Sequence, residues 1–187
     1  MFKRIFDLLL ALVASFLLAP VLFVVYLLVR LTSPGPAIYW SDRIGKRNRI
    51  FRMPKFRSMR QDTPILATHL LRNPRDYLSP VGGFIRKTSL DELPQLWSIL
   101  KGDMSFVGPR PALFNQKDLI ERRNQLGVEV LKPGLTGWAQ VNGRDELDTE
   151  AKVDLDYQYL LYRSFWFDLK ILWFTVLKVI RSEGVVH

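Results

Sequence analysis

The sequence predicts an α+β fold that is mainly helical with little sheet and that is anchored in a membrane. Three observations predict it: an uncharged apolar run from Leu8 to Val29, extended pieces confined to a short stretch after that run, and helical amphipathicity later in the chain. Residues 1–32 are expected to form a membrane-embedded re-entrant helix. Residues 33–187 are expected to form a cytoplasmic domain whose helix at 165–181 lies in the membrane interface.

Composition limits the chemistry. The chain has 187 residues, enough for one domain with a core and a membrane element. It has no cysteine, which excludes disulfides and thiolate sites, and its only histidines, His69 and His187, argue against a histidine-rich zinc site. The net charge of +9 points to an anionic partner such as a phosphorylated substrate, an acidic lipid or nucleic acid.

The apolar run is long enough to cross a bilayer, since a helix of this length reaches about 33 Å against a hydrocarbon core of about 30 Å. A cleaved signal peptide would be shorter and would not be followed by dense positive charge. Two interpretations remain: a straight transmembrane helix, and a hairpin that returns to the side it entered. Pro20 predicts a kink near the middle of the run. Basic residues flank both ends, and only a hairpin keeps both flanks in the cytoplasm.

The C-terminal segment from Phe165 to Ser182 also carries a membrane signal. On a helical wheel its polar residues share one arc, and a broad apolar surface that includes Trp166 and Trp173 fills the rest. Tryptophan beside lysine is typical of a helix in the headgroup layer. The alternative is an amphipathic helix whose apolar stripe faces a protein core.

The residues between these two segments predict short elements. Ser33-Pro34-Gly35-Pro36 separates membrane segment from domain. The first expected elements are extended pieces at Ala37–Trp40 and Ile50–Phe56 around a basic turn at 45–48, and a helix over Gln61–Leu78 broken near Asn73-Pro74. We next expect a flexible joint at Gly82-Gly83 and a helix from Asp91 or Glu92 to Leu100, with Gly102 just past its C-terminus. After it we expect a helix at Phe114–Leu126 ended by Gly127, a loop over Leu131–Arg144 with a short strand at Trp138–Val141, and a helix at Glu146–Tyr162.

Asp91 and Glu92 are the strongest candidates for chemistry. One interpretation is a capping box in which Ser89 caps the helix and Glu92 reaches back. Pro94 favours a different register with Asp91 as N-cap, because proline is tolerated at the third helical position. A carboxylate at a positive helix end can also act as a nucleophile toward phosphorus or hold Mg²⁺.

An anionic substrate needs cationic ligands, and several stand near the carboxylates. Arg110 lies between Pro109 and Pro111, which restrict its backbone, and arginine offers a bidentate fork for phosphate. Arg86 precedes Asp91 by five residues, and Lys55 with Arg57 lies in the basic strand region. For these last two a solvated or lipid-facing patch is the alternative. Arg144, after Asn142-Gly143, is interpreted as a further phosphate ligand, the alternative being a turn residue.

Competing phosphate and nucleic-acid motifs are missing from the sequence. There is no G-x-x-x-x-G-K-[ST], no strand followed by G-x-G-x-x-G, and no interleaving of basic and aromatic residues typical of single-strand binders. We therefore expect no nucleic-acid partner. Two alternatives from other classes stay open: a membrane-tethered nucleic-acid binder and a non-catalytic membrane scaffold. In neither would Asp91 or Glu92 have a catalytic role.

The motifs resemble those of the bacterial sugar transferase family, the monotopic phosphoglycosyl transferases, in their minimal single-domain type. The similarity runs through nearly the whole chain and is carried by Pro54–Met59, Ser89–Gln95, Lys101–Ser105, Gly108–Pro111 and Lys132–Arg144. One departure is Ala19-Pro20, where small members often have Ser-Pro at the bend of the membrane hairpin.

The resemblance implies transfer of a sugar phosphate from a UDP-sugar to undecaprenyl phosphate, with UMP as first product, at the cytoplasmic face of the bacterial inner membrane. It implies that Asp91 is the nucleophile and contacts Mg²⁺, and that Glu92 is the supporting carboxylate. It also implies phosphate binding by Lys55, Arg86 and Arg110. Membrane lipid is a further expected partner, and a homodimer is compatible with the sequence.

Overall fold

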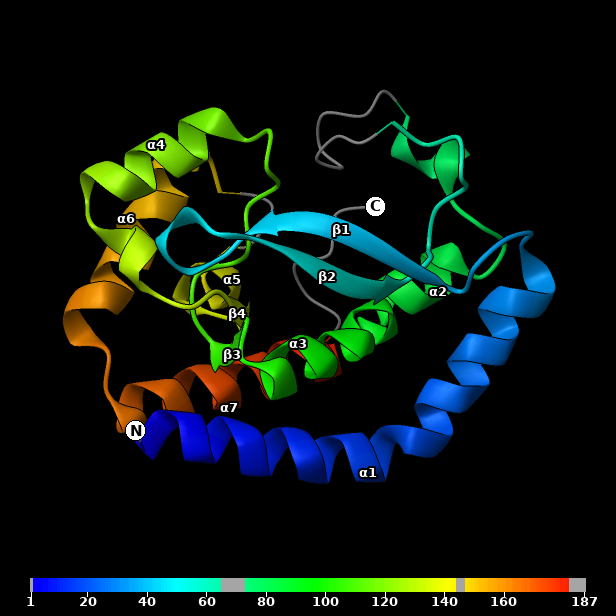
Figure 1. The fold of residues 1–187 in the computed structure, drawn as a ribbon, viewed down its shortest axis with the longest axis horizontal. Helices are drawn as coiled ribbons and strands as arrows, with labels where there is room; N and C mark the ends of the chain where they lie inside the picture. Colours follow the sequence, from blue (N-terminus) through cyan, green and yellow to red (C-terminus); the bar gives the residue numbers. More distant parts are fainter. Residues whose placement is uncertain (1, 65–72, 144–146, 182–187) are drawn as a thin grey trace.

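The computed structural model describes residues 2–64, 73–143 and 147–181, and it confirms a mainly helical α+β architecture with two small sheets (Figure 1). The main elements are α1 (Phe2–Thr32), β1 (Ile38–Ile44), β2 (Ile50–Phe56), α2 (Gly82–Lys87), η4 (Leu90–Gln95), α3 (Leu96–Lys101), β3 (Ser105–Val107), α4 (Lys117–Gln125), β4 (Gly134–Thr136), α5 (Trp138–Val141), α6 (Thr149–Tyr162) and α7 (Phe165–Arg181). Short 3-10 turns are η1 (Lys46–Asn48), η3 (Pro74–Tyr77) and η5 (Val128–Val130).

Helix α1 is continuous but not straight. In Figure 1 it runs along the lower edge of the molecule and then bends upward along one side. Residues up to Leu18 pack against a first hydrophobic cluster, whereas those from Leu22 pack against a second, and Pro20 lies between the two groups. It is the one helix among the described residues that is long and apolar enough to cross a membrane. Most of its apolar surface is exposed, as for Phe16 and Leu31.

The two clusters form the core on either side of this division. The first joins Phe51 and Met53 of the hairpin to α3, β3 and α7, with Ile99 and Ile171 fully buried. The second joins the end of α1 to β2 and α2, and its buried members are Val25, Val29, Ala37, Phe56 and Ile85. The apolar helix is therefore part of both cores.

The first turns of α1 are fixed to the domain by polar contacts. Arg4 donates to the carbonyls of Ile99 and Leu100 at the end of α3, where a helix leaves carbonyl groups unpaired. Asp7 is buried and accepts from the Phe106 N–H of β3 at 3.2 Å. Since the other end of α1 packs against β2 and α2, both of its ends contact the same domain.

Lys3 belongs to the same attachment. It forms an ion pair with Asp168 of α7, which is buried and also accepts from the Tyr159 hydroxyl at 2.6 Å. The rings of Phe2 and Phe165 meet edge to face nearby. The basic N-terminal flank is thus bound to residues far along the chain, which its charge alone does not predict.

Helix α7 differs from the simple two-faced helix predicted. Part of its polar arc faces inward: Asp168 is buried, and Thr175 shares a 2.7 Å hydrogen bond with Thr136 of β4. Its apolar surface is divided, with Ile171 in the core and a second stripe exposed. That exposed stripe consists of Trp166, Trp173, Val176 and Val179.

Strands β1 and β2 form an antiparallel hairpin longer than expected, with Tyr39 opposite Lys55 and Arg43 opposite Phe51. The predicted extended piece that ended at Trp40 therefore continues to Ile44. Alternation along the strands places Tyr39, Arg43 and Lys55 on one face. The second sheet is a short parallel pair of β3 and β4.

Two predictions for the region 61–102 are wrong in detail. Residues 61–64 form a turn and coil, so the helix expected from Gln61 does not begin there, and residues 65–72 lie outside the described part. The helix expected from Asp91 to Leu100 is instead the 3-10 segment η4 followed by α3, with Pro94 inside η4. Gly102 ends α3 at φ 99°, as predicted.

The strand predicted at Trp138–Val141 is wrong, because these residues form the short helix α5 and the strand lies before them at Gly134–Thr136. The helices predicted around residues 114–126 and 146–162 are confirmed as α4 and α6. Asp148 caps α6 by accepting from the Ala151 N–H at 2.8 Å.

The flexible joint predicted at Gly82-Gly83 is also wrong, because both residues open helix α2. Gly82 is buried, and a Cβ there would lie 1.9 Å from the backbone oxygen of Ser58. A Cβ on Gly83 would meet its nearest atom, Cδ1 of Leu78, at 3.8 Å. Gly82 therefore allows close packing of two backbones, whereas Gly83 has room for a Cβ.

This difference predicts opposite effects of one substitution at neighbouring positions. Gly82→Ala should lower the free energy of unfolding by about 1–3 kcal/mol, because the methyl group forces the backbone of Ser58 away. Gly83→Ala should leave it unchanged or raise it by up to about 1 kcal/mol, since alanine favours a helix over glycine. Thermal unfolding in one detergent measures both, and equal effects at the two positions would contradict the packing argument.

Candidate functional site

Asp91 and Glu92 lie in η4, directly before α3, and both are buried. The residue at the N-cap position is Ser89, not Asp91, and its side chain makes no capping hydrogen bond. Neither the predicted Asp91 cap nor the capping box is therefore formed. Ser89 has a left-handed backbone with φ 56°, a strained conformation for this residue type that turns the chain just before the carboxylates.

Glu92 gathers two cations on one oxygen. Its Oε1 accepts from Lys55 Nζ of β2 at 2.9 Å and from Arg110 Nη2 at 2.9 Å. The Lys55 and Glu92 side chains are 15% and 10% exposed, so the bonds are shielded from water. Burial lowers the pKa of Lys55, and Glu92 opposes that shift. Three segments far apart in the sequence meet at this oxygen.

Arg43 joins this group and was not singled out by the sequence analysis. It donates to Ser41 Oγ at 3.0 Å and to the Pro111 carbonyl at 3.2 Å. Burial, followed by repulsion from Arg110, lowers the pKa of Arg43 to about 10. The signal that could have found it is strand alternation, which puts Arg43 on the same face as Lys55 once β1 is known to reach Ile44.

The Asp91 carboxylate is buried but not engaged. The described residues offer it no hydrogen bond or ion pair, although Lys55, Arg86 and Arg110 are close enough to influence it. Burial raises the pKa of Asp91, and the three cations oppose the shift while Glu92 adds to it. The pair is thus divided: Glu92 is held between cations, and Asp91 has its oxygens available.

The backbone of Arg110 is supported from behind. Its carbonyl accepts from Arg123 Nη1 of α4 at 2.9 Å. Arg123 also donates from Nε and Nη2 to one oxygen of Asp156 in α6, at 3.0 and 2.6 Å. Asp156 is 1% exposed, and burial raises its pKa while Arg123 opposes the shift. Arg123 and Asp156 were missed from the sequence because nothing local pairs residues on two separate helices.

Of the predicted phosphate ligands, Lys55 and Arg110 lie at the carboxylates, and Arg86 is placed by α2 where its charge reaches Asp91. Arg144 lies outside the described residues. The predicted cluster is thus assembled for Asp91, Glu92, Lys55, Arg86 and Arg110.

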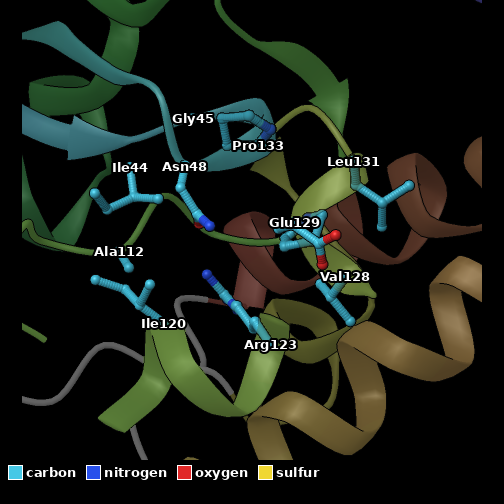
Figure 2. A pocket seen from close by; sticks show the side chains of 11 residues that line it. Ile44, Gly45, Asn48, Ala112, Ile120, Arg123, Val128, Glu129, Leu131 and Pro133 are labelled. Atoms are coloured by element: carbon cyan, nitrogen blue, oxygen red, sulfur yellow. The ribbon is translucent and has the colours of Figure 1, made fainter. Parts of the chain in front are cut away.

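A hollow lies elsewhere, between the hairpin turn, α4 and η5 (Figure 2). Its lining includes Asn48, Ile120, Arg123 and Glu129, and in Figure 2 the Arg123 side chain points toward the hairpin turn. Neither Asp91 nor Glu92 lines it. The hollow lies behind the loop that carries Arg110 and is separate from the group formed by Asp91, Glu92 and their cations.

The donor set fits a divalent cation shared with a phosphorylated ligand, not a cage made by the protein alone. The described residues contain no group of three or more carboxylate, histidine or cysteine side chains that could hold a metal. Mg²⁺ commonly binds through one or two carboxylates, with substrate phosphates and water completing its shell. The unengaged Asp91 carboxylate suits such a role, whereas Oε1 of Glu92 is occupied by two cations.

Comparison with known proteins identifies a family and several relatives. Residues 1–182 match the family described as bacterial sugar transferase. The chain is 42% identical to UDP-glucose:undecaprenyl-phosphate glucose-1-phosphate transferase of Escherichia coli K12, over 94% of this chain and 39% of that protein. It is 36% identical to UDP-N-acetylgalactosamine-undecaprenyl-phosphate N-acetylgalactosaminephosphotransferase of Aeromonas hydrophila, over 97% of this chain and 44% of that protein.

A third relative is similar in length as well. It is the uncharacterized sugar transferase EpsL of Bacillus subtilis strain 168, 41% identical over 98% of this chain and 89% of that protein. The chain therefore spans about two fifths of the first two relatives and most of the third.

The two carboxylates should respond oppositely to neutralisation. The pKa of Asp91 is raised in the folded state, so folding favours the neutral carboxyl group. The stability that this protonation contributes is fully present below about pH 4 and is lost as the pH rises through the raised pKa. Asp91→Asn should therefore leave the melting temperature unchanged or raise it at pH 7.5, and that gain should vanish near pH 4.

Glu92→Gln is the matched control, since it also removes one charge from the same segment. It should lower the free energy of unfolding by about 3–5 kcal/mol, because the amide oxygen can still accept from Lys55 and Arg110 but no longer neutralises their buried charge. Metal-free thermal unfolding of both variants tests the division. A marked loss of stability in Asp91→Asn would show that Asp91 is a structural carboxylate.

Proposed function

The chain belongs to the bacterial sugar transferase family, and on this premise we propose that it transfers a sugar 1-phosphate from a UDP-sugar to undecaprenyl phosphate. The observation that supports this most is the buried carboxylate pair, in which Glu92 holds Lys55 and Arg110 in place while Asp91 stays unengaged beside them. Relatives are named for this kind of reaction with glucose, N-acetylgalactosamine or galactose, and the proposed donor is accordingly a UDP-sugar as a class.

The proposed reaction has two displacements at one phosphorus atom. An Asp91 oxygen attacks the β-phosphorus of the UDP-sugar, the bond from that phosphorus to the bridging oxygen breaks, and UMP leaves with the oxygen and its electron pair. A phosphate oxygen of undecaprenyl phosphate then attacks the same phosphorus. The bond to Asp91 breaks, which restores the carboxylate and gives undecaprenyl diphosphate sugar.

The cations would supply electrostatic stabilisation in both steps. Lys55 and Arg110 are already aligned by Glu92, so little reorganisation is needed when negative charge develops on the phosphoryl oxygens. Arg110 has the additional support of Arg123 at its carbonyl. Asp91 and the donor diphosphate would hold Mg²⁺, which would neutralise phosphate charge. The cation would also lower the pKa of Asp91 and so favour its ionised form.

We place the protein in the bacterial inner membrane with its catalytic domain on the cytoplasmic face. Lys3, Arg4 and Asp7 bind the same domain that follows Thr32, which a helix crossing the bilayer would not permit. This supports a re-entrant α1 that bends near Pro20. The exposed Trp166 and Trp173 of α7 suit the headgroup layer beside it.

The reaction is tested by UMP release from a panel of UDP-sugars, with undecaprenyl phosphate and Mg²⁺ present. Asp91→Asn should lose nearly all turnover, about 10³-fold or more, and should form no phosphosugar adduct detectable by mass spectrometry of the intact protein. Chelation of Mg²⁺ should abolish both turnover and adduct. Near-normal turnover of Asp91→Asn would exclude it as the nucleophile.

The topology is tested by cysteine labelling in intact cells, which is direct because the chain has no native cysteine. Phe2→Cys should react with an impermeant maleimide only after the inner membrane is opened. Arg49→Cys, in the exposed hairpin turn, is the cytoplasmic control and should behave identically. Labelling of Phe2→Cys in intact cells without labelling of Arg49→Cys would show that α1 spans the membrane.

A further inference from the structure

Arg57, directly after β2, is a buried guanidinium with most of its hydrogen-bonding capacity unused. It is 6% exposed, and its Nη2 donates to the carbonyl and hydroxyl oxygens of Ser33 at 2.9 and 3.0 Å. Its Nε and Nη1 atoms are buried and have no hydrogen-bond partner among the described residues. No ion pair formed within residues 2–64, 73–143 and 147–181 includes Arg57. Buried charges are normally paired, so this arrangement is suited to an anionic ligand.

The surroundings increase the positive charge instead of balancing it. Burial, and then the charge of Arg30 at the end of α1, lowers the pKa of Arg57. The Arg30 side chain is exposed, and it approaches the Gly35 carbonyl at 3.5 Å. A Cβ on Gly35 would lie 2.6 Å from Arg57 Nη1, so glycine with its φ of 96° lets the backbone pass over the unused nitrogen.

Holding Ser33 does not by itself explain an arginine here. Both contacts use one nitrogen, so an amide or an ammonium group could make them. What a guanidinium adds is the N–H donors of Nε and Nη1, which lie on different sides of the group. Each can donate a charge-assisted hydrogen bond to one phosphate oxygen.

The position identifies which phosphate it would be. Arg57 lies two residues after Lys55 along the strand, so it points the same way about 7 Å farther from Arg43 and toward the end of α1. Ser33 directly follows the apolar helix, so the turn over Arg57 stands where that helix leaves the membrane in the topology proposed above. Asp91 does not influence the pKa of Arg57, which places the guanidinium outside the donor-phosphate group.

We propose that Arg57 and Arg30 bind the phosphate monoester of the polyprenyl acceptor at the membrane surface, in a subsite adjacent to the Lys55–Glu92–Arg110 group. This rests on the proposed transferase reaction. The subsite holds the acceptor phosphate beside the phosphoryl group that this phosphate attacks, because Arg57 lies two residues after Lys55. The donor half of the reaction does not use it.

The two half-reactions separate these roles. Exchange of labelled UMP into the UDP-sugar requires Asp91 and the donor but no acceptor, whereas full turnover also reports the KM for undecaprenyl phosphate. Arg57→Gln and Arg30→Gln should retain exchange within about twofold of the parent. Their KM for the acceptor should rise about tenfold to a hundredfold, the loss expected for a charge-assisted hydrogen-bonded pair.

Arg52→Gln is the matched control, because it removes the same charge from the same strand on its opposite face. Arg52 lies over the Trp40 ring at 5.4 Å and takes no part in the subsite. Its acceptor KM should match the parent's. Arg30→Gln keeps the test decisive if Arg57→Gln fails to fold, since Arg30 is exposed.

A binding measurement that needs no turnover accompanies the kinetics. Native mass spectrometry of the detergent-solubilised protein compares retention of polyprenyl phosphate, polyprenol and phosphatidic acid, with inorganic phosphate as competitor. Arg57→Gln or Arg30→Gln should lose polyprenyl phosphate and show unchanged retention of polyprenol.

The outcomes are distinct. Unchanged acceptor KM in both variants, equal loss of exchange and turnover, or the same KM rise in Arg52→Gln would overturn the subsite. Phosphatidic acid retained as strongly as polyprenyl phosphate would make it a general lipid-phosphate contact and overturn the acceptor assignment. Failure of the parent to exchange UMP with any UDP-sugar would instead refute the proposed function, and the retention measurement would still judge Arg57.

Discussion

The site depends on one carboxylate oxygen. Oε1 of Glu92 accepts from Lys55 of β2 and from Arg110 of the loop after β3, so a strand, a 3-10 segment and a loop converge on a single atom. Without this oxygen, Lys55, Arg43 and Arg110 would repel one another across a buried space; burial, and then repulsion from Arg110, already lowers the pKa of Arg43. Lys55 and Arg110 remain close because both donate to this oxygen of Glu92. The geometry around Asp91 follows from that constraint.

Much of this arrangement could be predicted from the sequence, because it is encoded locally. The apolar run of α1, the amphipathic α7 and the glycine after α3 follow from hydropathy, periodicity and turn chemistry. The family resemblance also predicted that five site residues lie together: Lys55, Arg86, Asp91, Glu92 and Arg110. No local sequence rule predicts this cluster, because none brings β2 beside η4. From the residues alone, Asp91 could be either a helix cap or a catalytic group.

What could not be predicted depends on contacts between distant segments. Trp138–Val141 has the composition of a strand, yet it forms a helical turn because the adjacent Gly134–Thr136 takes the parallel pairing with β3. Gly82 looks like a hinge until the backbone of Ser58 is placed against it. Lys3 and Arg4 are only a basic flank until α3 and α7 supply their partners. Each case requires tertiary structure that no local window contains.

The division between Asp91 and Glu92 explains why two adjacent carboxylates share one buried segment. A carboxylate fully paired with cations is a poor nucleophile, because its charge and lone pairs are already committed, whereas an unpaired buried one is reactive but disfavoured by desolvation. Placing the two side by side lets Glu92 hold the cations close enough to moderate the pKa of Asp91 without bonding to it. The strained backbone at Ser89 turns the chain directly before the pair. In the proposed mechanism, stability and reactivity would rest on separate side chains, with Glu92 holding the cations and Asp91 attacking phosphorus.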